Sequence, residues 1–363
     1  MLAQIFSPRA SRLLMGGLIA LILLAGCATA KEAPVAPAAE VRTLRVMTHD
    51  SFAISEGVLA AFETENNVKV QFLKSGDTGA TLNKAILAKN NPLADVLFGV
   101  DNTFLSRALE EDIFDPYPSP LLAEIDDAFK LDASQRALPV DYGDVCLNYD
   151  KAFLAERNLA PPTSLTDLTR PEYKSLLVVQ NPATSSPGLA FLLATIANFG
   201  EDGYLDYWKK LVANDVLVVN GWETAYYTEF SGSSGNGPRP IVVSYNSSPV
   251  FELIYAEKEL QEPPTAALVA PKTCFRQVEF VGILKGAQQR QLAEKWVDFM
   301  LSKTFQEDVP MQMFVFPVNK NARLDEVFVR YLQIPEQPAE VDPQLITEKR
   351  AEWLNAWTET VLR

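Results

Sequence analysis

The body of the chain alternates between short apolar runs and amphipathic stretches, and this alternation restricts the fold more than any other feature. Apolar runs of strand length occupy 44–49, 68–73 and 94–100, and helix-like stretches follow at 57–66, 81–90 and 103–112. Strands that are apolar along their whole length are typical of parallel sheets that helices cover on both faces. The first block of the chain therefore predicts an α/β fold.

The alternation resumes after a long extended run at 139–150. Strand-like runs at 176–180, 216–221 and 241–245 each precede a helical pattern, a second long extended run covers 275–287, and helices are expected at 291–303 and 343–363. Two α/β blocks with two long crossings predict a chain that passes from one domain to another and returns. We place lobe 1 at 43–140 plus 280–363 and lobe 2 at 141–279, with hinge crossings near 139–150 and 275–287.

The N-terminus has the features of an export signal. Arg9 and Arg12 precede an apolar run at 13–26, which is short for a membrane span and typical of a signal peptide. Leu24-Ala25-Gly26-Cys27 resembles the lipobox of bacterial lipoproteins, which implies cleavage before Cys27 and acylation of its thiol. An ordinary signal peptide with an incidental Cys is the alternative. We expect 1–26 to be removed and 27–42, rich in Ala and Pro, to tether the folded body to the membrane.

Charge and cysteine content exclude several classes of function. The formal net charge of the 363 residues is −14, and loss of Arg9 and Arg12 makes it more negative by two. Such acidity argues against nucleic acid and anionic lipid surfaces as partners. Cys146 and Cys274 match no metal-site spacing, and the chain contains one His. In an exported protein the two cysteines can form a disulfide, with two buried free thiols as the alternative.

Polar and aromatic residues follow the predicted strands. In open α/β sheets, ligands bind beyond the carboxyl ends of the strands. The residues at those positions are His49-Asp50-Ser51, 75–79, Asp101-Asn102, 184–186, Trp222 and 245–248. Their accumulation at one edge predicts a ligand site there.

The chemistry of these residues suits a flat cation with an anionic or hydroxyl tail. Asp50, Asp77 and Asp101 would face Trp222, Tyr226 and Tyr245, which favours charge pairing and cation–π contact. Taken singly, each Asp is also explained as a cap or turn residue. Ser186-Pro187 and Ser248-Pro249 read as a helix cap followed by Pro at the first helical position. Such helix starts favour an anion such as phosphate, and a plain capped helix is the alternative.

Several segments together resemble the thiamine-binding proteins of bacterial ABC importers. They are THDSF, GVDN, PVDYG, NPATSSPGLAFLL, NGWETAY, SYNSSP and FPV, in order from about residue 44 to the C-terminus. The resemblance implies a two-lobed type II periplasmic binding protein with a hinge, anchored to the cell membrane as an exported, monomeric lipoprotein. It also implies capture of thiamine or a thiamine phosphate, delivery to a membrane permease, and no cofactor, metal or catalytic residue.

The resemblance assigns ligand contacts by position. Asp77-Thr78 match an acidic residue and Gly, so Thr78 replaces the family's Gly. Ser185-Ser186 match Ser-Thr before Pro-Gly, Trp222 a tryptophan after Gly, and Tyr245-Asn246-Ser247-Ser248-Pro249 a Tyr-x-x-Ser-Pro stretch. Phe314 stands at a stacking tryptophan and His49 at the aromatic residue before Asp50. Of the first-strand pair we expect Asp50 to make the stronger contact, with His49 lining the cleft or packing beside it.

Three other functions remain open at this point. Ferric-binding proteins of the same superfold use adjacent tyrosines, and Tyr226-Tyr227 are adjacent here, but inside a predicted helix. Thiaminase I resembles this fold and uses a Cys nucleophile, whose position falls nearer Gly143 than Cys146. An adhesion or sensor lipoprotein that kept the fold is the third alternative.

Overall fold

The computed structural model describes residues 41–232 and 237–363. The predicted signal peptide, Cys27 and nearly all of the predicted tether therefore lie outside the described residues. Within these ranges, none of the helices has the length and apolar character that crossing a membrane requires.

The elements of the first block begin and end close to the predicted positions. They are β1 (Arg42–Thr48), α1 (Glu56–Asn66), β2 (Val68–Lys74), α2 (Thr78–Leu87), β3 (Val96–Asp101), α3 (Leu105–Glu110) and the short β4 (Phe114–Asp115). Two 3₁₀ turns, at Pro120–Glu124 and Asp127–Phe129, lead to the long strand β5 (Leu138–Asp150). The βαβαβα order that the apolar runs predict is confirmed.

The second block follows the same alternation. Its elements are α4 (Lys151–Glu156), 3₁₀ turns at Leu165–Thr169 and Pro171–Tyr173, β6 (Leu177–Gln180), α5 (Ser186–Ala213), β7 (Leu217–Val219), a π-helix at Thr224–Glu229, β8 (Ile241–Tyr245), α6 (Ser248–Ile254), β9 (Thr265–Leu268) and β10 (Phe275–Leu284). The chain ends with α7 (Arg290–Leu301), α8 (Lys303–Gln312), β11 (Phe316–Pro317), α9 (Glu326–Tyr331) and α10 (Pro343–Val361). The helical prediction after Trp222 is confirmed, although the turn is a π-helix.

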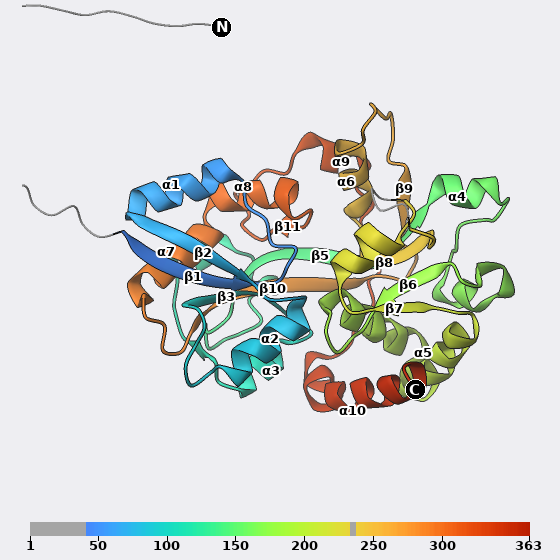
Figure 1. Ribbon diagram of the computed structural model, residues 1–363, viewed down its shortest axis with the longest axis horizontal. Helices are drawn as coiled ribbons and strands as arrows, with labels where there is room; N and C mark the ends of the chain where they lie inside the picture. Colours follow the sequence, from blue (N-terminus) through green and yellow to red (C-terminus); the bar gives the residue numbers. More distant parts are fainter. Residues whose placement is uncertain (1–40, 233–236) are drawn as a thin grey trace, which may run out of the picture. The chain divides into compact units, whose positions relative to one another are not determined.

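The strands form one mixed sheet in the order β2-β1-β3-β10-β5-β8-β6-β7. Pairing is parallel among β1, β2 and β3 and again among β6, β7 and β8, as the fully apolar runs predict. The two long crossings, β5 and β10, pair antiparallel with each other and join the two parallel groups. Figure 1 shows them running between the β1–β3 side and the β6–β8 side. The fold is thus the predicted two-lobed α/β arrangement.

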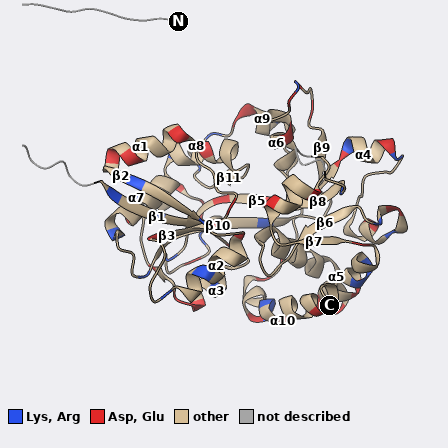
Figure 2. Cartoon of the chain, in the orientation of Figure 1, with Lys and Arg blue, Asp and Glu red and all other residues tan. Residues whose placement is uncertain are grey.

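Charged side chains are distributed over the outer helices. Figure 2 shows acidic segments on α1, α8 and α9 and basic segments on β2 and α2. This distribution is in line with the acidic composition.

The C-terminal helix α10 packs on α5 and also reaches the first block. The predicted lobe 1 contains 280–363, α5 belongs to predicted lobe 2, and Arg350 of α10 lies over the Phe104 ring of the first block at 5.7 Å. The indole rings of Trp357 and Trp208 lie 5.4 Å apart and perpendicular, and Trp353 is also buried. These large apolar rings require an apolar partner, and α5 provides it. The lobe boundaries stay a prediction.

The two crossing strands are joined covalently beside the sheet. Cys146 on β5 and Cys274 just before β10 form a disulfide, which decides between the two alternatives left open by the sequence. Arg276 adds two parallel hydrogen bonds of 2.9 Å to the carboxylate of Asp144 on the neighbouring strand. Both links hold β5 and β10 together at the end where the chain enters β10.

The disulfide yields a stability prediction. It closes a loop with a sequence separation of 128 residues, which restricts the unfolded chain strongly. The double substitution Cys146→Ser and Cys274→Ser is expected to lower the free energy of unfolding by about 2–4 kcal/mol. Urea unfolding measures this, and reductant should shift the midpoint of the wild type but not that of the double variant. Identical midpoints for all samples would contradict the stabilising role.

Candidate functional site

A cavity of about 270 Å³ lies where the ends of β1, β2 and β8 meet the middle of β10. Its lining comes from both blocks: 49–53, Lys74, Asp77-Thr78, Ser186-Pro187, Trp222-Glu223, Tyr226-Tyr227, Tyr245, Ser248, Phe251, Gln277, Glu279 and 312–315. Nine of the residues predicted from sequence are among them: His49, Asp50, Asp77, Thr78, Ser186, Trp222, Tyr245, Ser248 and Phe314. Strand ends far apart in the chain thus converge as expected for an α/β sheet.

Four predicted contact residues do not line the cavity. Ser185 is fully buried below the start of α5. The Asn246 amide donates to the Gln333 carbonyl at 3.0 Å, and the Ser247 hydroxyl donates to the Phe314 carbonyl. Pro249 is buried in the first turn of α6. Their surroundings indicate roles in holding the site together, and their assignment as ligand contacts stays untested.

The two helix starts are displaced by one residue from the predicted caps. The N-cap residues are Ser185 and Ser247, and Ser186 and Ser248 are the first residues of α5 and α6. Neither N-cap side chain accepts a hydrogen bond from its helix. Instead the Ser248 hydroxyl pairs with that of Ser244 at 2.8 Å. The Ser-Pro pattern locates a helix start, but the choice between two adjacent serines depends on tertiary partners.

The carboxylates of Asp50 and Asp77 are already engaged by backbone amides. Asp50 accepts from the Gly76 amide at 2.8 Å. Asp77 caps α2 by accepting from the Thr78 amide at 2.7 Å, and its second oxygen accepts from the Trp222 amide at 2.9 Å. The last bond links the α2 start to the turn before the π-helix, so Asp77 joins the two blocks. Of the two alternatives that the sequence left open, Asp77 is therefore a helix cap and Asp50 is a turn residue.

The start of α2 makes a close backbone contact with the loop before α5. The amides of Gly79 and Ala80 donate to the Thr184 carbonyl at 3.0 and 3.3 Å. A Cβ on Gly79 would lie 2.7 Å from the Ala183 carbonyl oxygen, so only glycine fits without a shift. The family's glycine is replaced by Thr78, and Gly79 makes the close backbone approach here.

Aromatic rings form two walls of the cavity. Trp222 stacks on Tyr226 with centroids 4.9 Å apart and planes 13° from parallel, and Tyr245 lies 6.5 Å from Trp222. On the other side Phe314 meets Phe251 edge-on at 4.5 Å. Trp222 is fixed further by donation of its indole N–H to the Ser244 hydroxyl at 2.9 Å. Two ordered aromatic walls suit a flat ligand.

Phe314 is held in a strained backbone conformation. Its φ is 57°, in the left-handed region that a bulky residue rarely adopts. The hydroxyl of Ser247 donates to its carbonyl and so helps to hold this conformation. Strain that the surroundings maintain is typical of positions whose side chain must point in a defined direction. Here that direction is into the cavity.

Behind one wall of the cavity lies a row of buried carboxyl groups, of which the sequence predicted Asp101 but not Glu279 or Asp141. Glu279 on β10 is opposite Asp101 on β3 and opposite Asp141 on β5, so the three form a row across neighbouring strands. Asp101 and Asp141 are fully buried, and Glu279 is 7% exposed and lines the cavity. Charged residues inside the apolar runs PVDYG and QVEFVG were the available signal.

The acidic row has raised pKa values. Burial raises the pKa of Glu279 to about 8, and the charges of Asp101 and Asp77 add to this effect. Burial, followed by the charge of the adjacent Glu279, raises the pKa of Asp141 well above its usual range. Burial raises the pKa of Asp101 to about 6, although the hydroxyl and the amide of Thr103 donate hydrogen bonds to its carboxylate. Glu279 therefore retains a proton at neutral pH, whereas Asp101 is mostly ionised.

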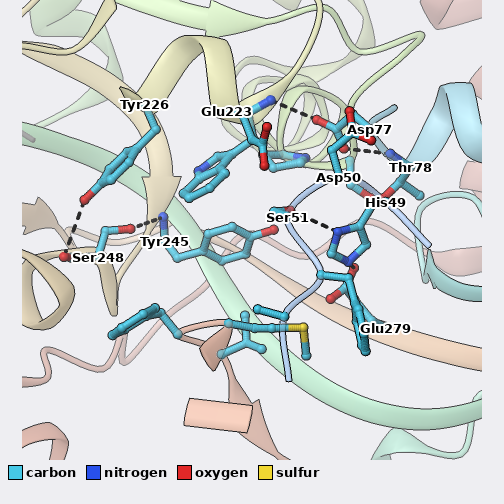
Figure 3. Close-up of a pocket in the computed structure, with 18 of the residues that line it drawn as sticks. His49, Asp50, Ser51, Asp77, Thr78, Glu223, Tyr226, Tyr245, Ser248 and Glu279 are labelled. Atoms are coloured by element: carbon cyan, nitrogen blue, oxygen red, sulfur yellow. Dashed lines mark hydrogen bonds and ion pairs between the residues drawn. The ribbon is translucent and has the colours of Figure 1, made fainter. Parts of the chain in front are cut away.

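His49 lies at the end of this row. Its Nε2 is 3.4 Å from Glu279 Oε1, and its Nδ1 is 2.9 Å from the Ser51 hydroxyl. Burial lowers the pKa of His49, which favours the neutral ring. Figure 3 shows His49 facing Glu279, with Tyr245 between this pair and Tyr226. His49 lines the cavity as expected and also packs against Phe98, at 5.5 Å.

The geometry of the site argues against the thiaminase and ferric-binding alternatives. Cys146 is bonded to Cys274 and buried, so it supplies no thiolate. A Cβ at Gly143, the position nearer the thiaminase nucleophile, would lie 2.8 Å from the Tyr245 ring. Tyr226 is buried, and its hydroxyl donates a hydrogen bond to the carboxylate of Glu252. Among the described residues, no group of three or more His, Cys, Asp or Glu side chains is arranged to hold a metal ion.

Comparison with known proteins supports a binding role. The profile described as bacterial extracellular solute-binding protein matches residues 91–354. A thiamine-binding periplasmic protein of Salmonella typhimurium is 32% identical over 335 residues, covering 90% of this chain and 96% of the relative. One of Escherichia coli is 30% identical over 332 residues, covering 90% and 96%. A solved periplasmic thiamin-binding protein superposes with a TM-score of 0.79 at 28% identity, covering 90% and 98%.

The close approach at Gly79 gives a prediction about the site. Gly79→Ala places a methyl group against the backbone at 183–184 and is expected to separate α2 from that loop. Overpacking of this kind costs about 1–3 kcal/mol of folding stability, and because the contact joins the two blocks beside the cavity, ligand affinity should also fall, by about tenfold. Gly57→Ala, on α1, is the control, because its Cβ would meet no atom within 4 Å. Equal affinity of both variants, measured by calorimetry, would show that the contact is unimportant for binding.

Proposed function

Because the chain belongs to the bacterial extracellular solute-binding proteins, we propose that it captures thiamine or a phosphate ester of thiamine outside the cytoplasm and delivers it to the permease of an ABC importer. The named relatives are thiamine-binding periplasmic proteins that align over nearly their whole length. The observation that carries the proposal to this chain is the cavity itself. It combines two aromatic walls with a buried acidic row, a combination suited to a flat cation.

The rings and the tail of the ligand would contact different residues of the cavity. An aminopyrimidine or thiazolium ring would lie between the Trp222–Tyr245 wall and the Phe251–Phe314 wall. A hydroxyl or phosphate tail would reach Ser186 at the start of α5, where the helix dipole favours anions, or Lys74 at the rim. The serine-rich helix starts thus remain the proposed position of the tail.

Capture would involve closure of the two blocks over the ligand. The bonds from the Trp222 amide to Asp77 and from the Gly79 amide to Thr184 join the blocks at the cavity edge. The strands β5 and β10 carry the chain between the blocks and would act as the hinge. A closed form that encloses the ligand would then dock on the permease.

The protein is exported, as its periplasmic relatives are. We further propose that cleavage before Cys27 and acylation of its thiol anchor it to the membrane, with 27–42 as the tether. We expect it to act as a monomer without a cofactor. Radiolabelled lipid incorporation that is lost in Cys27→Ala would support the anchor.

The ligand can be identified by direct titration. We expect purified protein to bind thiamine, thiamine monophosphate or thiamine diphosphate at least a hundredfold more tightly than hydroxymethylpyrimidine, because the smaller compound lacks the cationic ring. Isothermal titration calorimetry with each compound measures the affinities. A visible absorbance band on addition of ferric citrate, together with no heat from any thiamine compound, would favour the iron-binding alternative.

Trp222 should report ligand binding by its fluorescence. The other four tryptophans, Trp208, Trp296, Trp353 and Trp357, are fully buried away from the cavity lining, whereas Trp222 lines it. A thiamine-dependent change in emission is expected in the wild type and should be lost in Trp222→Phe. Trp222→Ala should weaken binding about tenfold or more, since stacking on a base contributes roughly 1–3 kcal/mol. Trp357→Phe is the matched control and should retain the emission change.

A further inference from the structure

The cavity contains a charge arrangement that the family resemblance did not point to. The carboxylates expected to meet a cation, Asp50 and Asp77, are occupied by backbone amides. Glu279 lines the same cavity and receives no hydrogen bond from a backbone amide within the described ranges. Glu279 on β10 is therefore a buried carboxyl group that lines the cavity and that no backbone amide holds among the described residues.

The acidic row lacks a cation of its own. Among the ion pairs of the described residues, none joins Asp101 or Asp141 to Lys or Arg, and Glu279 is paired only with His49. Burial lowers the pKa of His49, so the ring is neutral and offers no charge. The Nε2 atom of His49 is buried and makes no hydrogen bond to any of the described residues. Lys74 at the rim donates to the Asp50 carbonyl at 2.8 Å rather than to the row.

We propose that Glu279, flanked by Asp141 and Asp101, is the charge partner of the cationic ring of the ligand, and that capture of the cation releases a proton from this row. The inference rests on the proposed function and specifies which residue selects for positive charge. An unpaired buried carboxylate is unfavourable, so the empty site keeps a proton. A cation entering the cavity replaces that proton, which passes to the buffer, and the net charge of the site is unchanged.

The direction of the pH dependence follows. In the empty protein, burial raises the pKa of Glu279 to about 8, and a bound cation lowers it by stabilising the ionised form. Binding therefore releases a proton below about pH 8, and affinity falls as the pH decreases from 8. The titratable groups that face Glu279 are Asp101 on β3, Asp141 on β5, His49 after β1, Asp77 at α2 and Tyr245 on β8. Of these, the pKa of His49 is lowered and that of Tyr245 is raised well above its usual range, so neither supplies the proton near pH 7.

The test counts protons during calorimetric titration with thiamine. Thiamine is the probe because a phosphate ester has its own ionisation near pH 6. At pH 7, the heats in phosphate and Tris buffers should differ by the amount expected for close to one released proton per ligand. Thiamine should bind about tenfold to a hundredfold more weakly at pH 6 than at pH 8, since affinity falls up to tenfold per pH unit below the free-state pKa.

Variants and an uncharged ligand distinguish a charge-pairing role of Glu279 from a purely structural role. Glu279→Gln should weaken thiamine binding at least tenfold at pH 8, abolish proton release and flatten the pH profile. A thiophene analogue of thiamine, which has the same shape without the charge, should bind Glu279→Gln and wild type within about threefold of each other at pH 8. Glu348→Gln, an exposed site on α10, removes the same charge outside the cavity and should behave as wild type. If Glu279→Gln does not fold, Asp141→Asn should show the same reduced proton release.

Failure of the inference about Glu279 and failure of the proposed function would give different results. Thiamine binding by the wild type without proton release, or unchanged by Glu279→Gln, would overturn this inference and leave the proposed function intact. No binding of any thiamine compound by the wild type would overturn both.

Discussion

The antiparallel pairing of β5 with β10 fixes most of what is distinctive about this structure. The register of these strands places Asp141 opposite Glu279, and the register of β10 with β3 adds Asp101 on the other side. The same pair carries the chain between the two parallel groups, so it lies both at the connection of the blocks and under the cavity. The disulfide and the Arg276–Asp144 pair support it at one end. A shift of register by one residue would turn the acidic side chains to the opposite face.

The electrostatics of the cavity depend on burial more than on the number of carboxylates. Asp50 and Asp77 are partly exposed, and their carboxylates accept hydrogen bonds from backbone amides. Glu279 and Asp141 are shielded from water, and burial raises the pKa of both carboxyl groups. In a medium of low polarity, a fixed charge acts over a longer range than at the surface. Two carboxyl groups in one cavity can therefore have different roles, one holding backbone in place and one facing the ligand.

Local patterns predicted the elements well because helix and strand periods depend on neighbouring residues. The strands before His49 and before Trp222 were located from apolar runs alone. Tertiary contacts decided the rest: the cap of α5 is Ser185 and not the predicted Ser186, and α10 packs on α5 through Trp357. Neither outcome is encoded in a short stretch of sequence, since each depends on which surface is available after the chain folds.

By itself, the sequence determined the alternation of strands and helices, the two-block order and the set of polar and aromatic residues at the strand ends. Nine predicted residues lie around one cavity because parallel strands bring their carboxyl ends to a common edge. Only the tertiary structure decided which carboxylates are available, since hydrogen bonding of Asp77 and burial of Glu279 arise from segments more than a hundred residues apart. Periodicity is a local property, whereas register, burial and proton affinity are set by long-range pairing.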